Sequence, residues 1–198
     1  MYQWNGFKEK MDHELDRKPN STVHLSLLRE GYKLDGNGIK KQLGFNSLKS
    51  VDYIAENNAL ALVEFSDLYS QQNVLLSLSK TLYKSQAISN KDTKQINKKL
   101  WQTIQKELTD KYKDTLLIIE QMQKNNFCSK LEEHYKNDET VKKYWIIVSP
   151  FHPDIKEENK PELARFLDNL KDNIATSLPN KWNIKVQIIF IENFAKPK

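Results

Sequence analysis

The sequence predicts an α/β protein whose mixed central β-sheet is flanked by helices, with a long helical segment inserted between strands. Three observations support this fold class. Two short apolar runs, residues 51–55 and 60–66, flank an Asn-Asn pair and indicate a β-hairpin. Helical periodicity then extends over residues 75–122. The last third of the chain has the order strand, helix, strand, which favours a right-handed parallel crossover.

The first quarter of the chain contains all five glycines and is therefore expected to be rich in turns. Apolar residues at helical spacing predict a first helix that ends at Pro19; they are Trp4, Phe7, Met11 and Leu15. Residues 21–30 fit a strand or a short helix equally well. Residues 31–47 are expected to form a long loop with a turn at Asp35 and Gly36.

The remaining elements follow from apolar spacing and from proline positions. Both faces of the two hairpin strands are largely apolar, which indicates strands inside a covered sheet. The helical stretch breaks near Ser89, and a strand is expected at residues 144–149. A helix with Pro161 in its first turn and a last strand at residues 184–192 complete the chain. We expect one α/β domain over residues 1–198, with a helical segment at about 69–135 that packs on the core or extends from it.

Composition excludes several classes of protein. The single cysteine, Cys128, rules out an internal disulfide, and with only four histidines a cysteine-rich zinc site is excluded as well. No apolar run approaches the roughly 20 residues needed to cross a bilayer. The first residues lack a secretion signal pattern, so a cytoplasmic protein without a membrane partner is expected. No glycine follows Gly44, which argues against a phosphate-binding glycine loop and nucleotide-driven chemistry.

The charge balance is mildly basic, with 31 basic and 26 acidic residues and a net charge of +5. Only Arg17, Arg29 and Arg165 are arginines, and the other basic residues are lysines. Lysine is a solvated point charge that suits backbone-directed contact with nucleic acid. The same excess also fits a lysine- and asparagine-rich composition without any such partner.

Polar residues inside the two apolar strands are the strongest candidates for a functional site. Asp52 lies in the first strand, and Glu64 and Ser66 lie in the second. A two-residue hairpin loop would place Glu64 on the face opposite to Asp52. A three-residue loop would set Asp52 directly across from Glu64, with Ser66 on the same face.

Two carboxylates that face each other directly across a hairpin repel, and this raises the pKa of one of them unless a cation lies between them. Carboxylate oxygens suit Mg²⁺ or Mn²⁺. Structural alternatives remain for each residue: Asp52 could cap the start of a strand or pair with a lysine, and Glu64 could point to solvent from an edge strand. Asp67 is expected to cap the helix that follows it.

At these residues the chain resembles the PD-(D/E)xK nuclease superfamily. Asp52, the eleven intervening residues and Glu64-Phe65-Ser66 carry the resemblance, together with the order of elements over most of the chain. The resemblance implies a restriction-endonuclease-like fold and hydrolysis of nucleic acid, with DNA favoured over RNA. It also implies that Asp52 and Glu64 hold Mg²⁺ or Mn²⁺.

The sequence departs from the family pattern at the position of the motif lysine, where Ser66 stands. Lys80, on the following helix, is a candidate substitute. The family often adds an acidic residue from its first helix, for which Glu14 is preferred over Glu9 and Asp12.

Two functions therefore remain open. The first is a metal-dependent nuclease, in which the long helix at residues 94–122 forms a wall of a nucleic-acid groove or a dimerisation arm. The second is a non-catalytic pseudo-nuclease that binds nucleic acid or a protein partner as an inhibitor, immunity or regulatory module.

Overall fold

The computed structural model describes residues 4–13, 15, 27–56, 60–85, 88–124, 139–149, 157 and 160–196. Six strands form one sheet in the order β1-β2-β3-β4-β5-β6. The strands are β1 (Lys8–Lys10), β2 (Glu30–Lys33), β3 (Tyr53–Glu56), β4 (Leu60–Ser66), β5 (Lys142–Val148) and β6 (Ile184–Phe190). The helices are α1 (Ile39–Gln42), α2 (Leu68–Lys84), α3 (Asn90–Lys124), α5 (Lys160–Ser177) and α6 (Ile191–Ala195), with 3-10 turns at Trp4–Phe7 and Asn180–Trp182.

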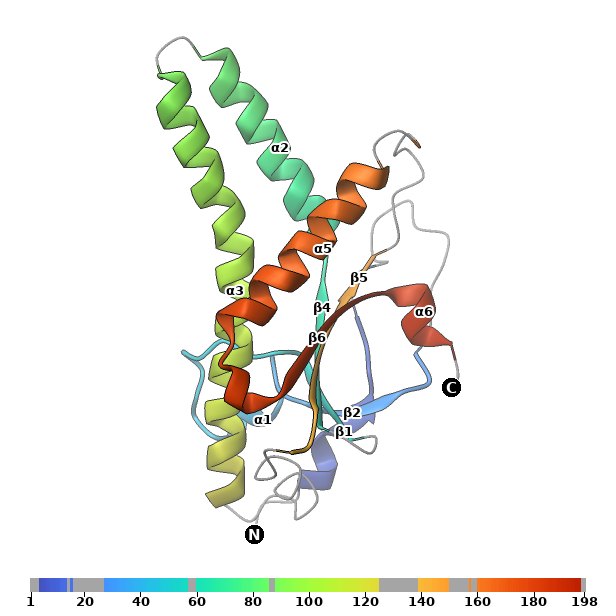
Figure 1. Ribbon diagram of the computed structural model, residues 1–198. Coiled ribbons are helices and arrows are strands. Elements are labelled where there is room, and N and C mark those ends of the chain that lie inside the picture. Colours follow the sequence, from blue (N-terminus) through green and yellow to red (C-terminus); the bar gives the residue numbers. More distant parts are fainter. Residues whose placement is uncertain are drawn as a thin grey trace.

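The sheet is mixed, as the sequence predicts. Strands β1 to β4 form an antiparallel meander, whereas β4, β5 and β6 run parallel to one another. The α2–α3 hairpin connects β4 to β5, and α5 connects β5 to β6 (Figure 1). Two parallel neighbouring strands need such a long crossover, because the chain must return to the same end of the sheet before the second strand begins.

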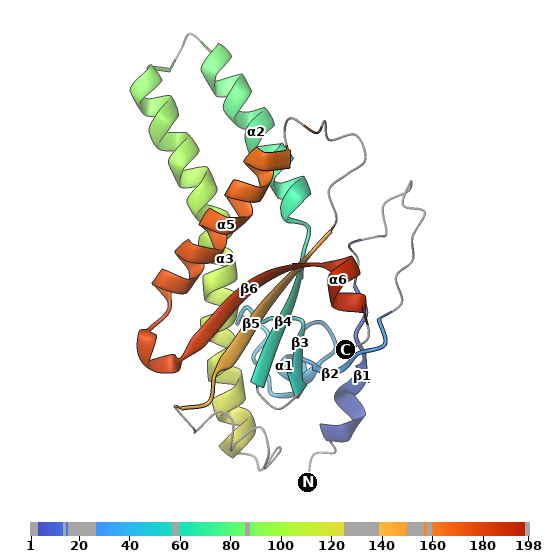
Figure 2. The ribbon, with the colours of Figure 1, turned by 45° about the vertical axis from the view of Figure 1, so that its right-hand side comes forward.

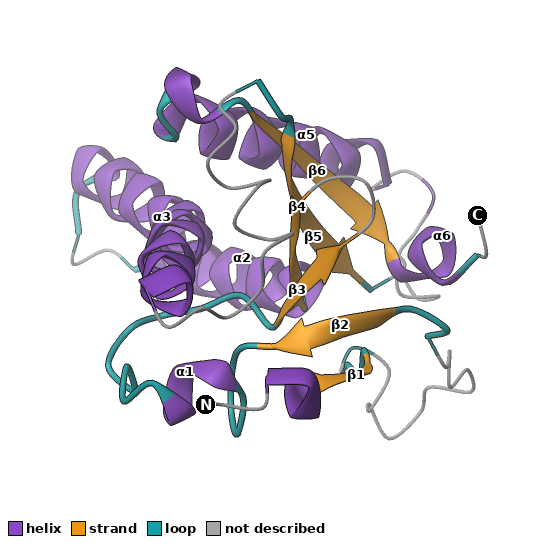
Figure 3. Cartoon of the chain, turned by 90° about the horizontal axis from the view of Figure 1, so that it is seen from below, coloured by secondary structure: helices purple, strands orange, loops and turns teal. Residues whose placement is uncertain are grey.

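Helices cover both faces of the sheet (Figure 3). On one face, Ile54, Leu62 and Ile146 pack with Leu108 and Tyr112 of α3 in the larger apolar cluster. Helix α5 contributes to the same cluster. On the opposite face, the apolar cluster contains residues of β3, β4, β5 and α6, namely Tyr53, Val63, Trp145 and Phe194. The strands are therefore apolar on both sides, which explains their continuous apolar runs.

Helices α2 and α3 form a long hairpin that extends past the sheet (Figures 1 and 2). The second half of α3 lies against the sheet, where Leu108, Tyr112 and Ile119 are buried. The first half of α3 runs beside α2 in the part that projects, and its Trp101 ring lies 5.0 Å from the Phe166 ring of α5, measured between centroids. Among the described residues, no helix combines the length and the apolar character needed to cross a membrane.

The predicted N-terminal helix is wrong. Residues Trp4–Phe7 form a 3-10 turn, and Lys8–Lys10 form strand β1, which pairs with β2. The Met11 amide continues this pairing by donating to the Arg29 carbonyl at 2.9 Å. The four-residue spacing from Phe7 to Met11 fits one face of a helix and also one face of a strand. Long-range pairing with β2 outweighs the local helical preference.

Further boundaries differ from the sequence prediction, including those of β3, which is Tyr53–Glu56 in place of 51–55, and β5, which is Lys142–Val148 in place of 144–149. The expected loop at residues 31–47 begins inside β2 and contains the short helix α1. Its predicted turn at Asp35 and Gly36 is present. Gly36 has φ of +60°, and the Gly38 amide donates to the Asp35 carbonyl at 2.9 Å. The last strand ends at Phe190, and α6 follows at once. Helix α3 ends at Lys124, and residues 125–138 lie outside the described residues.

Candidate active site

The register of the β3–β4 hairpin decides whether the two candidate carboxylates meet. Glu56 pairs with Leu60 and Tyr53 pairs with Val63, the register of a three-residue loop. Asp52 precedes Tyr53 directly and therefore lies opposite Glu64. The Phe65 amide donates to Asp52 Oδ2 at 2.7 Å, which fixes the aspartate beside the glutamate's strand. The alternative with the two residues on opposite faces is excluded.

A lysine from helix α3 completes the cluster. Lys111 Nζ lies 2.5 Å from Glu64 Oε1, and the Glu64 side chain is only 2% exposed. The other oxygen, Glu64 Oε2, is buried and has no hydrogen-bond partner among the described residues. Asp52, Glu64 and Lys111 therefore come from the start of β3, from β4 and from α3. We call these three residues the carboxylate–lysine cluster.

Hydrogen bonds between α3 and the segment before β3 hold the cluster in place. The Val51 amide donates to Thr115 Oγ1 at 3.0 Å, and the Lys49 amide donates to Asp114 Oδ2 at 3.0 Å. Thr115 lies one helical turn beyond Lys111, so both face the same side of α3. The helix that supplies the lysine thus also positions the residue next to Asp52.

Burial dominates the electrostatics of the cluster. Burial, and then the neighbouring Asp52, raise the pKa of Glu64 to about 8, although Lys111 works in the opposite direction. Burial also raises the pKa of Asp52, against the Phe65 amide that stabilises its charged form. Burial opposes the charged form of Lys111, but the nearby carboxylates, Glu64 first and then Asp52 and Glu107, together outweigh burial and raise the pKa of this lysine. A raised carboxyl pKa beside a cation is a common property of functional sites.

Asp52 also faces a hollow of about 650 Å³. The hollow is lined by Asp12, His13, Leu15, Lys33, Asp35, Gly36, Asp52, Tyr53, Phe65 and Asp67. It lies at the carboxyl end of β4, the edge at which open α/β sheets bind their ligands. Glu64 is not among the lining residues, so it lies behind Asp52 rather than in the wall of the hollow.

The other candidate residues have different positions. Ser66 is buried on β4, two residues after Glu64 and on the same face. Lys80 is exposed on α2, about 18 Å along the helix from its start, and does not join the cluster. Asp67 caps α2 as predicted, accepting from the Ser70 amide at 3.0 Å.

The acidic residues proposed for the N-terminal segment also need a new assignment. Glu14 lies outside the described residues. Glu9, on β1, accepts hydrogen bonds from Lys33 at 2.9 Å and from the Tyr53 hydroxyl at 3.1 Å. Asp12 lines the hollow, and its amide donates to the Tyr53 hydroxyl at 3.1 Å.

Sequence reasoning missed Lys111, although the sequence contains a signal for it. Residues of α3 at alternating spacings of four and three form its buried side, namely Ile104, Leu108, Lys111, Thr115, Ile118 and Met122. Lys111 and Thr115 are the polar members of this otherwise apolar series. A lysine at such a position requires a buried partner, because an isolated charge is costly to bury.

No group of three or more His, Cys, Asp and Glu side chains that could hold a metal ion occurs among the described residues. No protein-family model, curated protein or solved structure matches this chain.

Proposed function

We propose that the chain is a metal-dependent nuclease of the PD-(D/E)xK type whose lysine comes from helix α3. The observation that carries this proposal is the convergence of Asp52, Glu64 and Lys111 on one face of the sheet. These are the residue types that the resemblance requires, with Lys111 in place of a lysine at position 66.

The restriction-endonuclease-like fold is part of the same proposal. From residue 51 onward, the element order agrees with the resemblance: the strand after Asp52, a short connection, the Glu64 strand, helices, and β5 parallel to β4. Helix α5 and strand β6 then complete the order.

Asp52 and Glu64 would hold the Mg²⁺ or Mn²⁺ ion. Their fit rests on the buried Glu64 Oε2, which has no hydrogen-bond partner among the described residues, and on Asp52 directly across the hairpin. Carboxylate oxygens are suitable ligands for both ions. When bound, such an ion lowers the pKa of water and stabilises negative charge on a phosphate.

The chain's own residues would contribute binding, orientation and charge. The Phe65 amide orients the Asp52 carboxylate at the wall of the hollow, where a phosphodiester would enter. The Lys111 ammonium group, which like Glu64 is not among the residues that line the hollow, would supply from behind Asp52 the positive charge that Ser66 lacks. A fixed cation stabilises the charge that develops on a nearby phosphate. Glu64 holds that ammonium group in position through its Oε1 atom.

The test is a cleavage assay on single- and double-stranded DNA and RNA with Mg²⁺ or Mn²⁺. Asp52→Asn, Glu64→Gln and Lys111→Met are each expected to reduce cleavage by about 100-fold or more, since each removes either a proposed metal ligand or the cation of the site. The matched control is Lys113→Met, because Lys113 is an exposed lysine on the same helix as Lys111. Its cleavage rate is expected to equal that of the wild type.

Titration calorimetry with Mn²⁺ separates chemistry from binding. The wild type is expected to bind Mn²⁺, and Asp52→Asn is expected to lose this binding. Full cleavage by a folded Asp52→Asn variant would contradict the proposal. Absence of both cleavage and Mn²⁺ binding in the wild type would contradict it too.

A second candidate function is a non-catalytic pseudo-nuclease that binds nucleic acid or a protein. The observation that favours it is the Lys111 ammonium group itself, which already supplies a cation to Glu64 at 2.5 Å. In that case the wild type would bind a partner without binding Mn²⁺, and Lys111→Met would lower stability without affecting any cleavage.

A further inference from the structure

The positive charge of the protein is concentrated on the projecting half of the α2–α3 hairpin. We call residues 78–106 the arm. The arm contains seven lysines, one aspartate and no arginine, a formal charge of +6, whereas the whole chain has +5. The rest of the protein is therefore close to neutral. The seven lysines are Lys80, Lys84, Lys91, Lys94, Lys98, Lys99 and Lys106.

The lysines of the arm differ from several lysines elsewhere in lacking an acidic partner among the described residues. All seven are exposed, and none of them forms an ion pair with another described residue. On the remainder of the protein, Lys124 pairs with Glu120 at 3.2 Å, and Lys171 pairs with Asp168 at 3.3 Å. Like charges that gather on one hairpin repel each other, and a bound polyanion would reduce this repulsion between the lysines of the arm.

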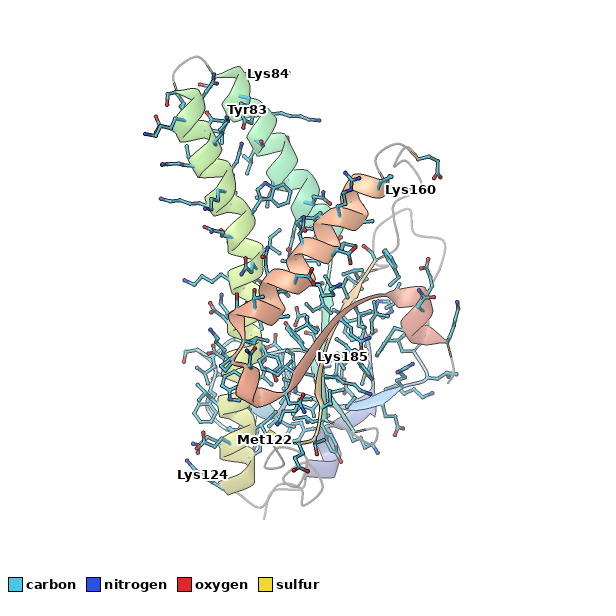
Figure 4. The ribbon with its side chains drawn as sticks, in the orientation of Figure 1. Tyr83, Lys84, Met122, Lys124, Lys160 and Lys185 are labelled. Atoms are coloured by element: carbon cyan, nitrogen blue, oxygen red, sulfur yellow. The ribbon has the colours of Figure 1, made fainter. Side chains whose placement is uncertain are left out.

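The geometry of α3 puts its five arm lysines on one side. At about 100° per residue, they lie opposite the buried positions Thr93 and Ile104. From Lys91 to Lys106 this face extends about 22 Å along the helix axis. The hairpin reaches past the sheet, with Tyr83 and Lys84 near its end, so the face is accessible to a large partner (Figure 4).

We propose that the outer face of the arm binds the phosphate backbone of duplex nucleic acid. Lysine suits this role because its point charge contacts phosphates without reading bases. Release of condensed counterions from the duplex would supply the binding free energy. A second copy of the chain is a poor partner for this face, because two arms of the same sign repel. The proposal goes beyond the cleavage site and does not depend on it.

The test measures duplex binding by fluorescence anisotropy in EDTA, over a range of KCl concentrations. The arm variant combines Lys91→Gln, Lys94→Gln and Lys98→Gln, exposed substitutions that keep a good helix former. The control variant combines Lys124→Gln, Lys171→Gln and Lys185→Gln and loses the same net charge. Circular dichroism checks that both variants are folded.

The arm variant is expected to bind about ten-fold more weakly, and the negative slope of log K against log[KCl] is expected to become shallower by about 2 to 3. The control variant is expected to stay within about two-fold of the wild type. Equal losses in both variants, or no loss in the arm variant, would overturn the proposal.

Two further outcomes would overturn it by assigning the arm to another partner. If the arm variant kept duplex binding but lost binding to a polyglutamate peptide, an acidic protein would be the partner. If it changed from dimer to monomer in sedimentation and kept duplex binding, the partner would be a second copy. The binding assay is done in EDTA, which removes divalent ions. Unchanged duplex binding by the arm variant would therefore say nothing about the Asp52–Glu64 site, which Mn²⁺ calorimetry on the same variant tests separately.

Discussion

A single buried carboxyl group, Glu64, accounts for most of the unusual electrostatics of this protein. It is 2% exposed, has Asp52 across the hairpin, and contacts Lys111 through one of its two oxygens. A buried pair of this kind adds little net stability, because taking both groups out of water costs about as much free energy as their mutual attraction returns. The contact between Glu64 and Lys111 is therefore weak evidence for a stabilising role.

The stability of the protein should fall with rising pH because of Glu64. Its pKa rises from 4.5, the usual value for a solvated glutamate, to about 8 in the fold, so the folded state binds more protons than the unfolded state between these values. Stability from the protonated form is complete below about 4.5 and is lost as pH rises towards about 8. Glu64→Gln removes this titration, so its free energy of unfolding, relative to wild type, should increase by a few kcal/mol between about pH 5 and pH 8.5.

Urea unfolding in EDTA at several pH values measures this difference. The matched control is Glu120→Gln, since Glu120 is a glutamate of α3 that is about half-exposed and pairs with Lys124. The control should give a nearly constant difference across the pH range. Parallel pH profiles for wild type and Glu64→Gln would show that Glu64 is ionised throughout.

At the scale of elements, helix α3 organises the site because it contacts the segment that leads into Asp52. Thr115 accepts the Val51 amide at 3.0 Å, and Asp114 accepts the Lys49 amide at 3.0 Å. The Tyr144 hydroxyl donates to the Leu108 carbonyl at 3.0 Å and ties α3 to β5 as well. One rigid helix therefore sets the distance between its lysine, Lys111, and the two carboxylates.

Thr115→Val should weaken this contact without changing the size of the side chain. The buried Val51 amide would lose its acceptor, at a cost of about 1 to 3 kcal/mol in the free energy of unfolding. Thr115→Ser keeps the hydroxyl and should recover most of the loss. The Val51 amide should also exchange faster with solvent in Thr115→Val. The control is Thr103→Val, an exposed threonine of the same helix, whose effect should stay within about 0.5 kcal/mol.

The contrast between β4 and β1 shows which elements can be predicted from sequence. Strand β4 is a continuous apolar run buried on both faces, and helix α3 has apolar residues at helical spacing, so both elements have strong sequence signals. Strand β1 has the sequence Lys-Glu-Lys and is exposed, so only its pairing with β2 creates it. The same limit applies to Lys111. The periodicity places it on the buried side of α3, but only the tertiary fold identifies Glu64 as its partner.

At the scale of the whole molecule, α3 links two parts with different physical character. Its second half packs under the sheet, where Leu108, Tyr112 and Ile119 are buried. Its first half belongs to the arm, packs against α2 and, through Trp101, against α5, and carries exposed lysines. The carboxylate–lysine cluster and the basic face are thus separated along one helix, with the cluster at the sheet and the basic face on the projection.

Hydrogen exchange along α3 should reveal this division. Amides of the arm should exchange faster than those around Tyr112, because local opening is easier where fewer apolar groups are buried. Raising KCl from about 0.05 M to 0.3 M should slow exchange in the arm, since salt screens the repulsion between its lysines. Amides near Tyr112 should show no such change, and the variant with Lys91, Lys94 and Lys98 replaced by Gln should lose most of the salt effect. Uniform protection along α3 would instead mean that the helix opens as one unit and that its charge does not destabilise the arm.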